Sequence, residues 1–224
     1  MEEKKPKVLF SHQYAHCCQK KTKRPVKLRM DRDDDILITG KRHDFYSDYE
    51  VGFNDKGIIE GVKIKLLSRC GISPDLSGAI NSRALLHIDN AYYLSNILVE
   101  NYLCKTNTSS STAFRGVGGN QGMMIIENIM DNVAKYLKKD PAEVRKINFY
   151  QKNKKNITHY GMRIQDNVIN EIFNKLIKSS NYKNRTFNIK KFNLKNRYFK
   201  KGLAITPVIF GISFTTIHLN QAGA

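Results

Sequence analysis

A glycine-rich turn that runs directly into an apolar stretch constrains the fold more than any other feature of this chain. Residues 112–130 read TAFRGVGGNQGMMIIENIM, and Gly116, Gly118 and Gly119 leave the turn almost free of Cβ atoms. Glycine adopts positive φ without strain and lets the backbone approach a ligand. The free N–H groups at a helix N-terminus suit an anion. The spacing matches neither GxGxxG after a clear strand nor GxxxxGKS/T, so on spacing alone a turn that caps a packed helix is the more frequent structure.

Three helices are predicted after this turn. The apolar residues of the first recur at helical spacing, which is more typical of a core-facing stripe than of a cofactor site; they are Met123, Ile126, Met130, Val133, Ala134 and Leu137. Asp140 is a suitable N-cap for the second helix, with Pro141 in its first turn and Glu143 in a capping box. The third helix is marked by Ile164, Val168, Ile172 and Leu176.

The N-terminal half reads as strands with fewer helices. Apolar alternation in residues 49–53 and 58–67 around the turn Asn-Asp-Lys-Gly predicts a β-hairpin. Further expected strands are residues 26–30 and 91–103, and residues 202–214 read as a strand plus a turn. We expect a helix at residues 11–22, a solvated charged turn rather than a metal site at 32–35, and a looser stretch at 68–82. The fold class is therefore mixed α/β (α+β).

The composition excludes some classes of protein. The chain has 224 residues, of which 41% are hydrophobic, enough for one large domain or two small ones. Its four cysteines (Cys17, Cys18, Cys70 and Cys104) form no CxxC pair, which fits a reducing compartment. The start MEEKKPKVLF is not a secretory signal, and no apolar run of about 20 residues occurs. We therefore expect a cytoplasmic protein without a membrane span.

The net charge of +18 raises the question of a nucleic-acid partner. Residues 181–201 contain many lysines and arginines, no acid, and the interleaved aromatics Phe187, Phe192, Tyr198 and Phe199, a pattern that can bind single-stranded nucleic acid. The favoured interpretation is a helix with a solvated basic face, packed on its aromatics. A basic nucleic-acid-binding module that uses residues 183–201 stays the alternative.

Six stretches carry a family resemblance. AFRGVGGNQG resembles the AFRGFGGPQG segment in the molybdenum-cofactor subunit of the xanthine dehydrogenase and aldehyde oxidase family. RPVKLRMDRDDDILITGKRHDF, SRALLHIDN, CKTNT, PAEVRKINFY and FGISFTTIHLNQAGA resemble further signature stretches of the xanthine dehydrogenase branch. They occur in the family's order and at about its spacing.

The resemblance implies an architecture and a chemistry. Residues 1–152 would be the C-terminal part of a first molybdopterin-binding domain, and residues 160–224 the truncated start of a second. The chain would be a fragment, completed by the remainder of the molybdenum subunit and by an iron–sulfur and FAD subunit. Such enzymes hydroxylate xanthine or hypoxanthine, or an aldehyde, at molybdenum held on molybdopterin, and electrons leave through 2Fe-2S clusters to FAD.

The resemblance also implies roles for particular residues. Arg83 would be catalytic, binding the purine substrate and stabilising charge on it, although a structural ion pair is the plain alternative. Val117, Phe214 and Thr215 would line the substrate pocket, but Val117 stands where the family usually has a stacking Phe. The residues next to the cofactor would be Phe114, Arg115 and Gly116, with the backbone of Arg115 nearest to molybdenum.

The resemblance places two further glutamates, the general base and a second substrate-binding residue, outside this sequence. The glutamates that are present do not sit in matching motifs and receive no role; they include Glu60, Glu100, Glu127 and Glu143. Since a hydroxylase without its base would lose orders of magnitude in rate, this chain alone is expected to be inactive.

Overall fold

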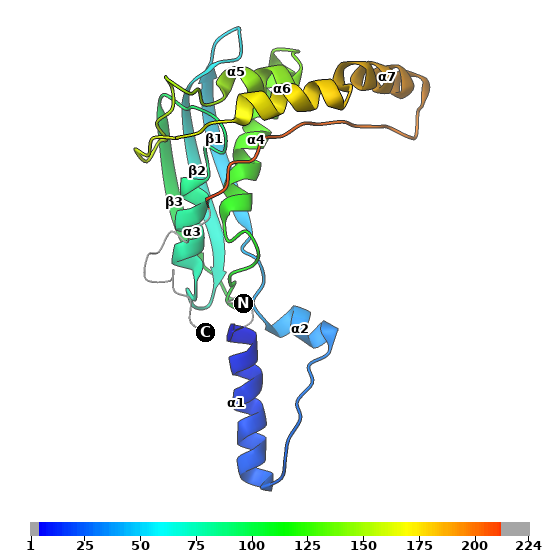
Figure 1. The fold of residues 1–224 in the computed structure, drawn as a ribbon. Helices are drawn as coiled ribbons and strands as arrows, with labels where there is room; N and C mark the ends of the chain where they lie inside the picture. The colour runs from blue at the N-terminus through cyan, green and yellow to red at the C-terminus, as the bar shows by residue number, and fades with distance from the viewer. Residues whose placement is uncertain (1–4, 212–224) are drawn as a thin grey trace.

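The computed structural model describes residues 5–211, and side chains from residue 13 onward. A three-stranded sheet with helices on one face forms the body (Figure 1). The elements, in chain order, are α1 (Lys5–Thr22), α2 (Arg32–Ile38), β1 (Phe45–Phe53), β2 (Ile59–Gly71), α3 (Ser77–Leu86), β3 (Ile97–Lys105), α4 (Gly119–Tyr136), α5 (Pro141–Asn148), α6 (Ile169–Ser179) and α7 (Tyr182–Lys195).

The sheet has the order β1-β2-β3 and combines two kinds of pairing. β1 and β2 form the predicted antiparallel hairpin, while β3 pairs parallel to β2 after the crossover through α3. At the hairpin turn, the Asn54 side chain accepts hydrogen bonds from the amides of Lys56 and Ile58, both at 3.1 Å. Asn148 of α5 accepts from the Ile59 amide and donates to the Gly57 carbonyl, so this turn is tied to the helical layer.

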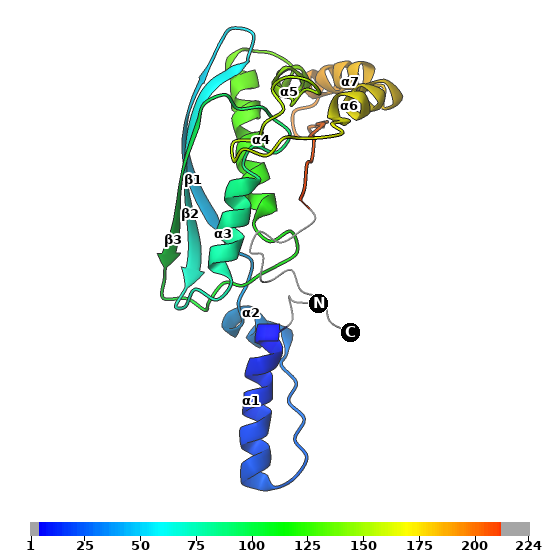
Figure 2. The same cartoon turned by 60° about the vertical axis from the view of Figure 1, so that its left-hand side comes forward.

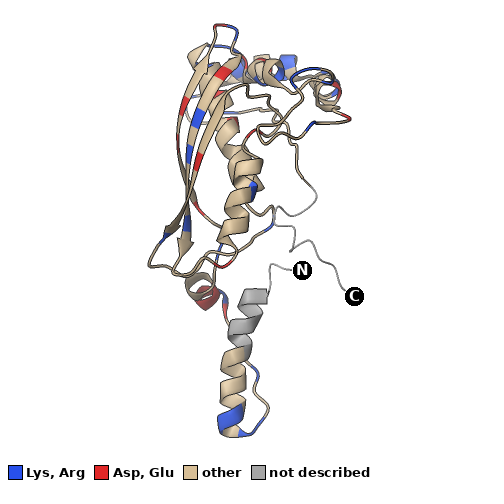
Figure 3. Cartoon of the chain, turned by 90° about the vertical axis from the view of Figure 1, so that its left-hand side faces the viewer, with Lys and Arg blue, Asp and Glu red and all other residues tan. Residues whose placement is uncertain are grey.

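The core lies between one face of the sheet and the helices. Side chains of β2 alternate between buried and exposed, and the buried Val62, Ile64 and Leu66 pack with the apolar stripe of α4. Figure 2 shows the sheet nearly edge-on, with α3 and α4 on one side. The exposed positions of β2 include Lys63, Lys65 and Arg69, and Figure 3 marks the charged residues along the strands. The helices therefore cover a single face of the sheet, as is common for a two-layer fold.

The start of α4 packs directly on the backbone of α3. A Cβ atom at Gly118 would lie 2.0 Å from the carbonyl oxygen of Ile80, and one at Gly122 would lie 2.3 Å from that of Ala84. Gly118 also has φ +85°, a value that residues with a side chain rarely adopt. The glycines therefore allow the two helices to approach closely.

A buried ion-pair cluster joins α4 and α5. Arg145 is only 2% exposed, and its guanidinium donates to Glu127 at 2.7 Å and to Asp131 at 2.8 Å. Tyr92 donates its hydroxyl to the same Glu127 carboxylate at 2.6 Å. Burial, and next the Glu127 charge, raise the pKa of Tyr92, which keeps that hydroxyl protonated as a donor.

Several sequence predictions are confirmed. Helices form at the predicted places for α1, α4, α5 and α6, although α1 begins earlier and α6 later than predicted. Asp140 caps α5, accepting from the Ala142 amide at 2.8 Å. None of the helices that residues 5–211 form is both long and apolar enough to span a bilayer. The division into domains at residues 1–152 and 160–224 stays a prediction.

Other predictions are wrong. Residues 26–30 form no strand, and residues 32–35 begin α2 because Asp31 caps it, accepting from the Asp34 amide at 2.9 Å. The supposedly loose residues 68–82 contain the end of β2 and the start of α3, while residues 91–96 precede β3 rather than belonging to it. Residues 202–211 form no strand. The basic segment does not pack on its aromatics: Phe187 of α7 is exposed, and so are Tyr198 and Phe199 after the helix, while Phe192 is only partly buried.

Replacing Gly122 tests the close approach of the helices. Gly122→Ala is expected to lower the free energy of unfolding by about 1–3 kcal/mol, since its Cβ would overlap the Ala84 carbonyl oxygen. Gly78→Ala is the matched control, because Gly78 is also helical but exposed, with no atom within 4 Å of its added Cβ. The control should stabilise the chain by about 0.5–1 kcal/mol. Equal urea midpoints for the two variants would contradict the proposed contact.

Replacing Arg145 tests the ion-pair cluster. Arg145→Met is expected to cost about 3–5 kcal/mol, since the Glu127 carboxylate would lose its buried cation. Arg69→Met removes a half-exposed partner of Asp44 and should cost less than about 1 kcal/mol. Urea unfolding followed by circular dichroism measures both. A loss for Arg145→Met no larger than for Arg69→Met would refute the structural role.

Candidate functional site

Arg83 lies in the last turn of α3 and is only 5% exposed. Its guanidinium donates to the carbonyl oxygen of Gly211 and lies over the ring of Phe210, 4.6 Å from the ring centroid. Burial lowers the pKa of Arg83, but an arginine stays cationic in proteins. The structure therefore holds a fixed positive charge against the 210–211 segment.

His87, one turn after Arg83, was not singled out from the sequence. Its Nδ1 lies 2.9 Å from the Arg83 carbonyl oxygen, so Nδ1 carries the proton and donates. Its Nε2 lies 3.1 Å from the Gly211 amide and accepts from it. These two bonds define a neutral imidazole. Desolvation by burial is the main cause that lowers the pKa of His87, which agrees with the neutral form.

The glycine loop, residues 114–119, meets these residues from a distant part of the sequence. A Cβ atom at Gly119 would lie 2.6 Å from the Phe210 ring, while Gly118 rests on the α3 backbone. Val117 has φ +40°, a strained value for a β-branched residue. The loop, the end of α3 and the 210–211 segment thus come together, although more than 100 residues separate Arg83 from Gly211.

The three predicted cofactor residues occupy the outer side of this loop. Phe114 and Arg115 are exposed, and the guanidinium of Arg42 lies over the Phe114 ring, 4.5 Å from its centroid. The side chain of Asn120 fills the space where a Cβ at Gly116 would lie. Within residues 5–211, the backbone amides of Arg115 and Gly116 donate to no acceptor.

Three buried side-chain atoms beside the loop have no hydrogen-bond partner in the described part of the chain. They are Nη1 of Arg42, Nδ1 of His43 and Oε1 of Gln121. The amide group of Gln121 donates to the His43 carbonyl at 3.2 Å, so His43 and Gln121 are neighbours. Buried polar groups without partners are rare. Together with the two backbone amides, they fit a polar group such as a pterin bound against this loop.

The remaining predicted residues, Phe214 and Thr215, lie outside the described residues. The structure places the glycine loop, through Gly118 and Gly119, against α3 and Phe210, but within residues 5–211 it shows no direct contact of Arg83 with Val117 or with the cofactor residues. The roles of all these residues stay predictions. Of the residues that sequence reasoning missed, His87 lies at i+4 from Arg83, on the same helical face. Arg42 and His43 lie inside one of the matching stretches.

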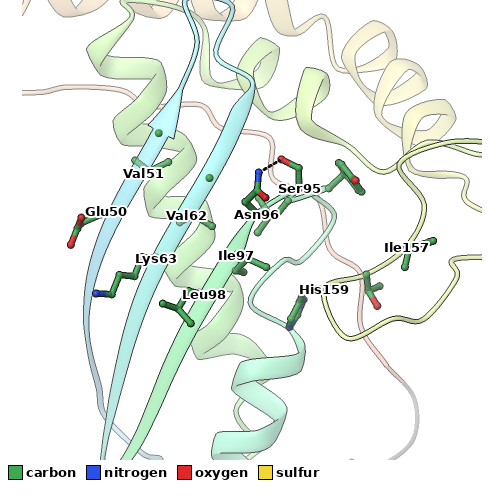
Figure 4. A pocket seen from close by; sticks show the side chains of 15 residues that line it. Glu50, Val51, Val62, Lys63, Ser95, Asn96, Ile97, Leu98, Ile157 and His159 are labelled. Atoms are coloured by element: carbon green, nitrogen blue, oxygen red, sulfur yellow. Dashed lines mark hydrogen bonds between the residues drawn. The ribbon is translucent and has the colours of Figure 1, made fainter.

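Two of the hollows that the described residues form bear on the location of the site. One, of about 1030 Å³, lies beside the strands and the 157–159 segment, with Lys63, Asn96 and His159 on its walls (Figure 4). None of the predicted site residues lines it. The other, of about 480 Å³, borders the site, because His87, Phe210 and Gly211 belong to its wall. Among residues 5–211, no cluster of three His, Cys, Asp or Glu side chains is placed to hold a metal ion.

The fold is similar to parts of larger solved enzymes. Aldehyde oxidoreductase from Desulfovibrio desulfuricans is similar with a TM-score of 0.62 and 24% identity, over 69% of this chain and 17% of that one. CO dehydrogenase from Oligotropha carboxidovorans gives a TM-score of 0.63 and 19% identity, over 73% of this chain and 21% of that one. At this identity, the likeness concerns the fold.

Sequence comparison defines the family. Residues 4–149 match the family model described as the molybdopterin cofactor-binding domain, and the chain belongs to this family. Xanthine dehydrogenase/oxidase from Gallus gallus is 46% identical over 204 residues, and xanthine dehydrogenase from Dictyostelium discoideum is 39% identical over 221 residues. These matches cover 91% and 99% of the chain but only 15% and 16% of the relatives. The chain thus spans a small part of their length.

The neutral form of His87 predicts a pH dependence. Because its pKa lies below the usual 6.5 in the folded chain, the unfolded chain binds this proton more readily. The His87 contribution to stability is therefore complete above pH 6.5 and is lost as the pH falls from there towards the lowered pKa. NMR titration of the His87 ring should give a midpoint below 6.5. His87→Gln should reduce the loss of stability in this pH range, and a His87 midpoint at or above 6.5 would contradict the assignment.

Proposed function

We propose that this chain supplies a substrate-binding arginine and a cofactor-binding loop to a molybdenum hydroxylase that oxidises xanthine or hypoxanthine. The observation that carries this proposal is the 39–46% identity to xanthine dehydrogenases over most of the chain. The meeting of Arg83, the glycine loop and the 210–211 segment in one place supports it.

Arg83 would bind the purine and stabilise negative charge that develops on it during attack. A guanidinium suits this task because it is always charged and presents several donors in a fixed plane. Its environment supports the role, since the Gly211 carbonyl and the Phe210 ring hold the side chain in place before substrate arrives. A group held in advance loses little free energy to reorganisation during the reaction. With Val117 at the position where the family usually has a stacking Phe, the substrate pocket would be looser.

The glycine loop would hold the molybdenum cofactor. The free amides of Arg115 and Gly116 would donate to its oxygen atoms, with the Arg115 backbone nearest to molybdenum. When bound, the cofactor supplies the redox centre and the oxygen that is transferred. The residues of this chain bind and orient it, and Phe214 and Thr215 would complete the pocket on the substrate side.

The general base would come from outside the described residues. Glu127 is committed to Tyr92, Asn90 and Arg145, and Glu60 accepts from Asn54 on the surface. By the family resemblance, the base, the 2Fe-2S clusters and FAD would reside on the remainder of the enzyme, in the cytoplasm. Residues 1–152 and 160–224 would contribute to two successive cofactor-binding domains.

The first test is the composition of the native complex. The chain would be tagged at its own locus and purified gently, and its molybdenum content and accompanying chains determined. We expect about one molybdenum per complex and a partner that carries the missing glutamates. A preparation without molybdenum and without such a partner would refute the proposed function.

The second test addresses Arg83 within that complex. Arg83→Lys should lower kcat/KM for xanthine by about 10²-fold or more, since a flexible ammonium cannot reproduce the planar donors. Molybdenum content should stay unchanged. The control is Arg69→Lys, which also replaces arginine by lysine, but at a half-exposed side chain on the sheet. Unchanged kcat/KM in Arg83→Lys would assign this residue a structural role alone.

A further inference from the structure

The last helix and the residues after it form a basic arm, defined here as residues 182–201. The arm carries eight exposed basic residues: Lys183, Arg185, Lys190, Lys191, Lys195, Arg197, Lys200 and Lys201. It contains no acid, and the sequence has no Asp or Glu after Glu171. The charge therefore has no counterpart nearby along the chain.

Helix α7 has very little packing of its own. Tyr182 is its one fully buried residue, with its hydroxyl 3.0 Å from Asp140, and the rest of the helix projects from the body at the outer end of α6 (Figure 1). A helix of 14 residues is marginal in water without a packed face. Lys191 and Lys195 are four residues apart, and such like charges weaken it further. An anionic partner would remove this repulsion.

Large apolar side chains are exposed on the same arm. Leu194 is 88% exposed, Tyr198 83% and Phe199 77%. Phe187 and Leu194 are seven residues apart and therefore share a helix face, and Lys190 and Lys191 lie between them on that face. Cations and apolar groups are thus interleaved. Helices that lie in a membrane surface instead separate the two kinds of residue onto opposite faces.

Three rings of the arm each have one of the arm's own cations close to them. Lys191 lies 4.3 Å from the centroid of Phe187, Lys201 lies 4.1 Å from that of Phe192, and Arg197 lies 5.6 Å from that of Tyr198. Binding of single-stranded nucleic acid relies on open ring faces on which bases stack. At these three rings a stacking base would compete with a cation of the arm, and the exposed Leu194 offers no ring to a base. These two features favour a protein partner over nucleic acid.

We propose that the basic arm is a docking surface for an acidic protein surface with an apolar recess. Carboxylates of the partner would pair with Lys190, Lys191 and Lys195, and the recess would take Leu194 and Phe187. Aromatic and arginine side chains are enriched at such interfaces, and charge complementarity guides the encounter. This proposal stands independently of the proposed function.

The test uses the full chain and peptide probes that carry a tryptophan, since the chain has none. One acidic peptide carries leucines at helical spacing, and a second has the same charge with serines in their place. A single-stranded oligothymidylate and vesicles of phosphatidylserine and phosphatidylcholine are the competing ligands. We expect the leucine-bearing acidic peptide to bind most tightly, with an affinity that falls as salt is added.

Two variants locate the binding. Lys190→Gln, Lys191→Gln and Lys195→Gln together should weaken binding about tenfold, whereas Phe187→Ser with Leu194→Ser should abolish the preference for the leucine-bearing peptide. The control replaces three exposed lysines of the sheet, Lys63, Lys65 and Lys105, by Gln. Circular dichroism checks that each variant folds. Equal effects of the arm and sheet variants, or tighter binding of oligothymidylate or vesicles, would overturn the proposal.

Discussion

The close approach of α3 and α4 is the constraint on which the rest of the structure depends. It needs glycine at positions 118 and 122, because any Cβ there would overlap carbonyl oxygens of α3. The contact places the apolar stripe of α4 over the sheet and carries the glycine loop to the end of α3. One steric requirement therefore serves both the core and the candidate site. It also gives the glycines a use beyond the two that the sequence suggested, which were capping a packed helix and close approach to a ligand.

The sequence was sufficient to predict the elements whose signals are local. The hairpin, the α4 stripe and the Asp140 cap each depend on residues close together in the chain. The failures have other causes. Three consecutive acids suggested a turn at residues 32–35, but Asp31 caps a helix there. Helix α3 was not predicted, because the burial of its residues depends on contacts with α4. Residues 202–211 are apolar because they cover the body, without pairing as a strand.

The sequence could suggest residues for the site, whose roles stay predictions, but not their contacts. A family resemblance pointed to Arg83 and the glycine loop, and the structure brings them together. No local pattern could have shown that Arg83 and His87 both bind Gly211, because that contact spans most of the chain. The sequence could not show the unpartnered atoms of Arg42, His43 and Gln121 either, because whether a polar atom lacks a hydrogen-bond partner can be seen only in the folded structure.

A continuous polar chain connects the core to the site. Arg145 binds Glu127, Glu127 accepts from Asn90, and Asn90 holds the Pro207 carbonyl and the Ile209 amide. Two residues further on, Gly211 meets Arg83. Buried polar networks cost free energy when incomplete, so each member fixes the next in one arrangement. Apolar contacts could bind residues 207–211 as firmly, but they would not fix as uniquely which residue lies at which position. The polar chain therefore positions the 207–211 segment, and with it the surroundings of Arg83, from a charge pair in the core.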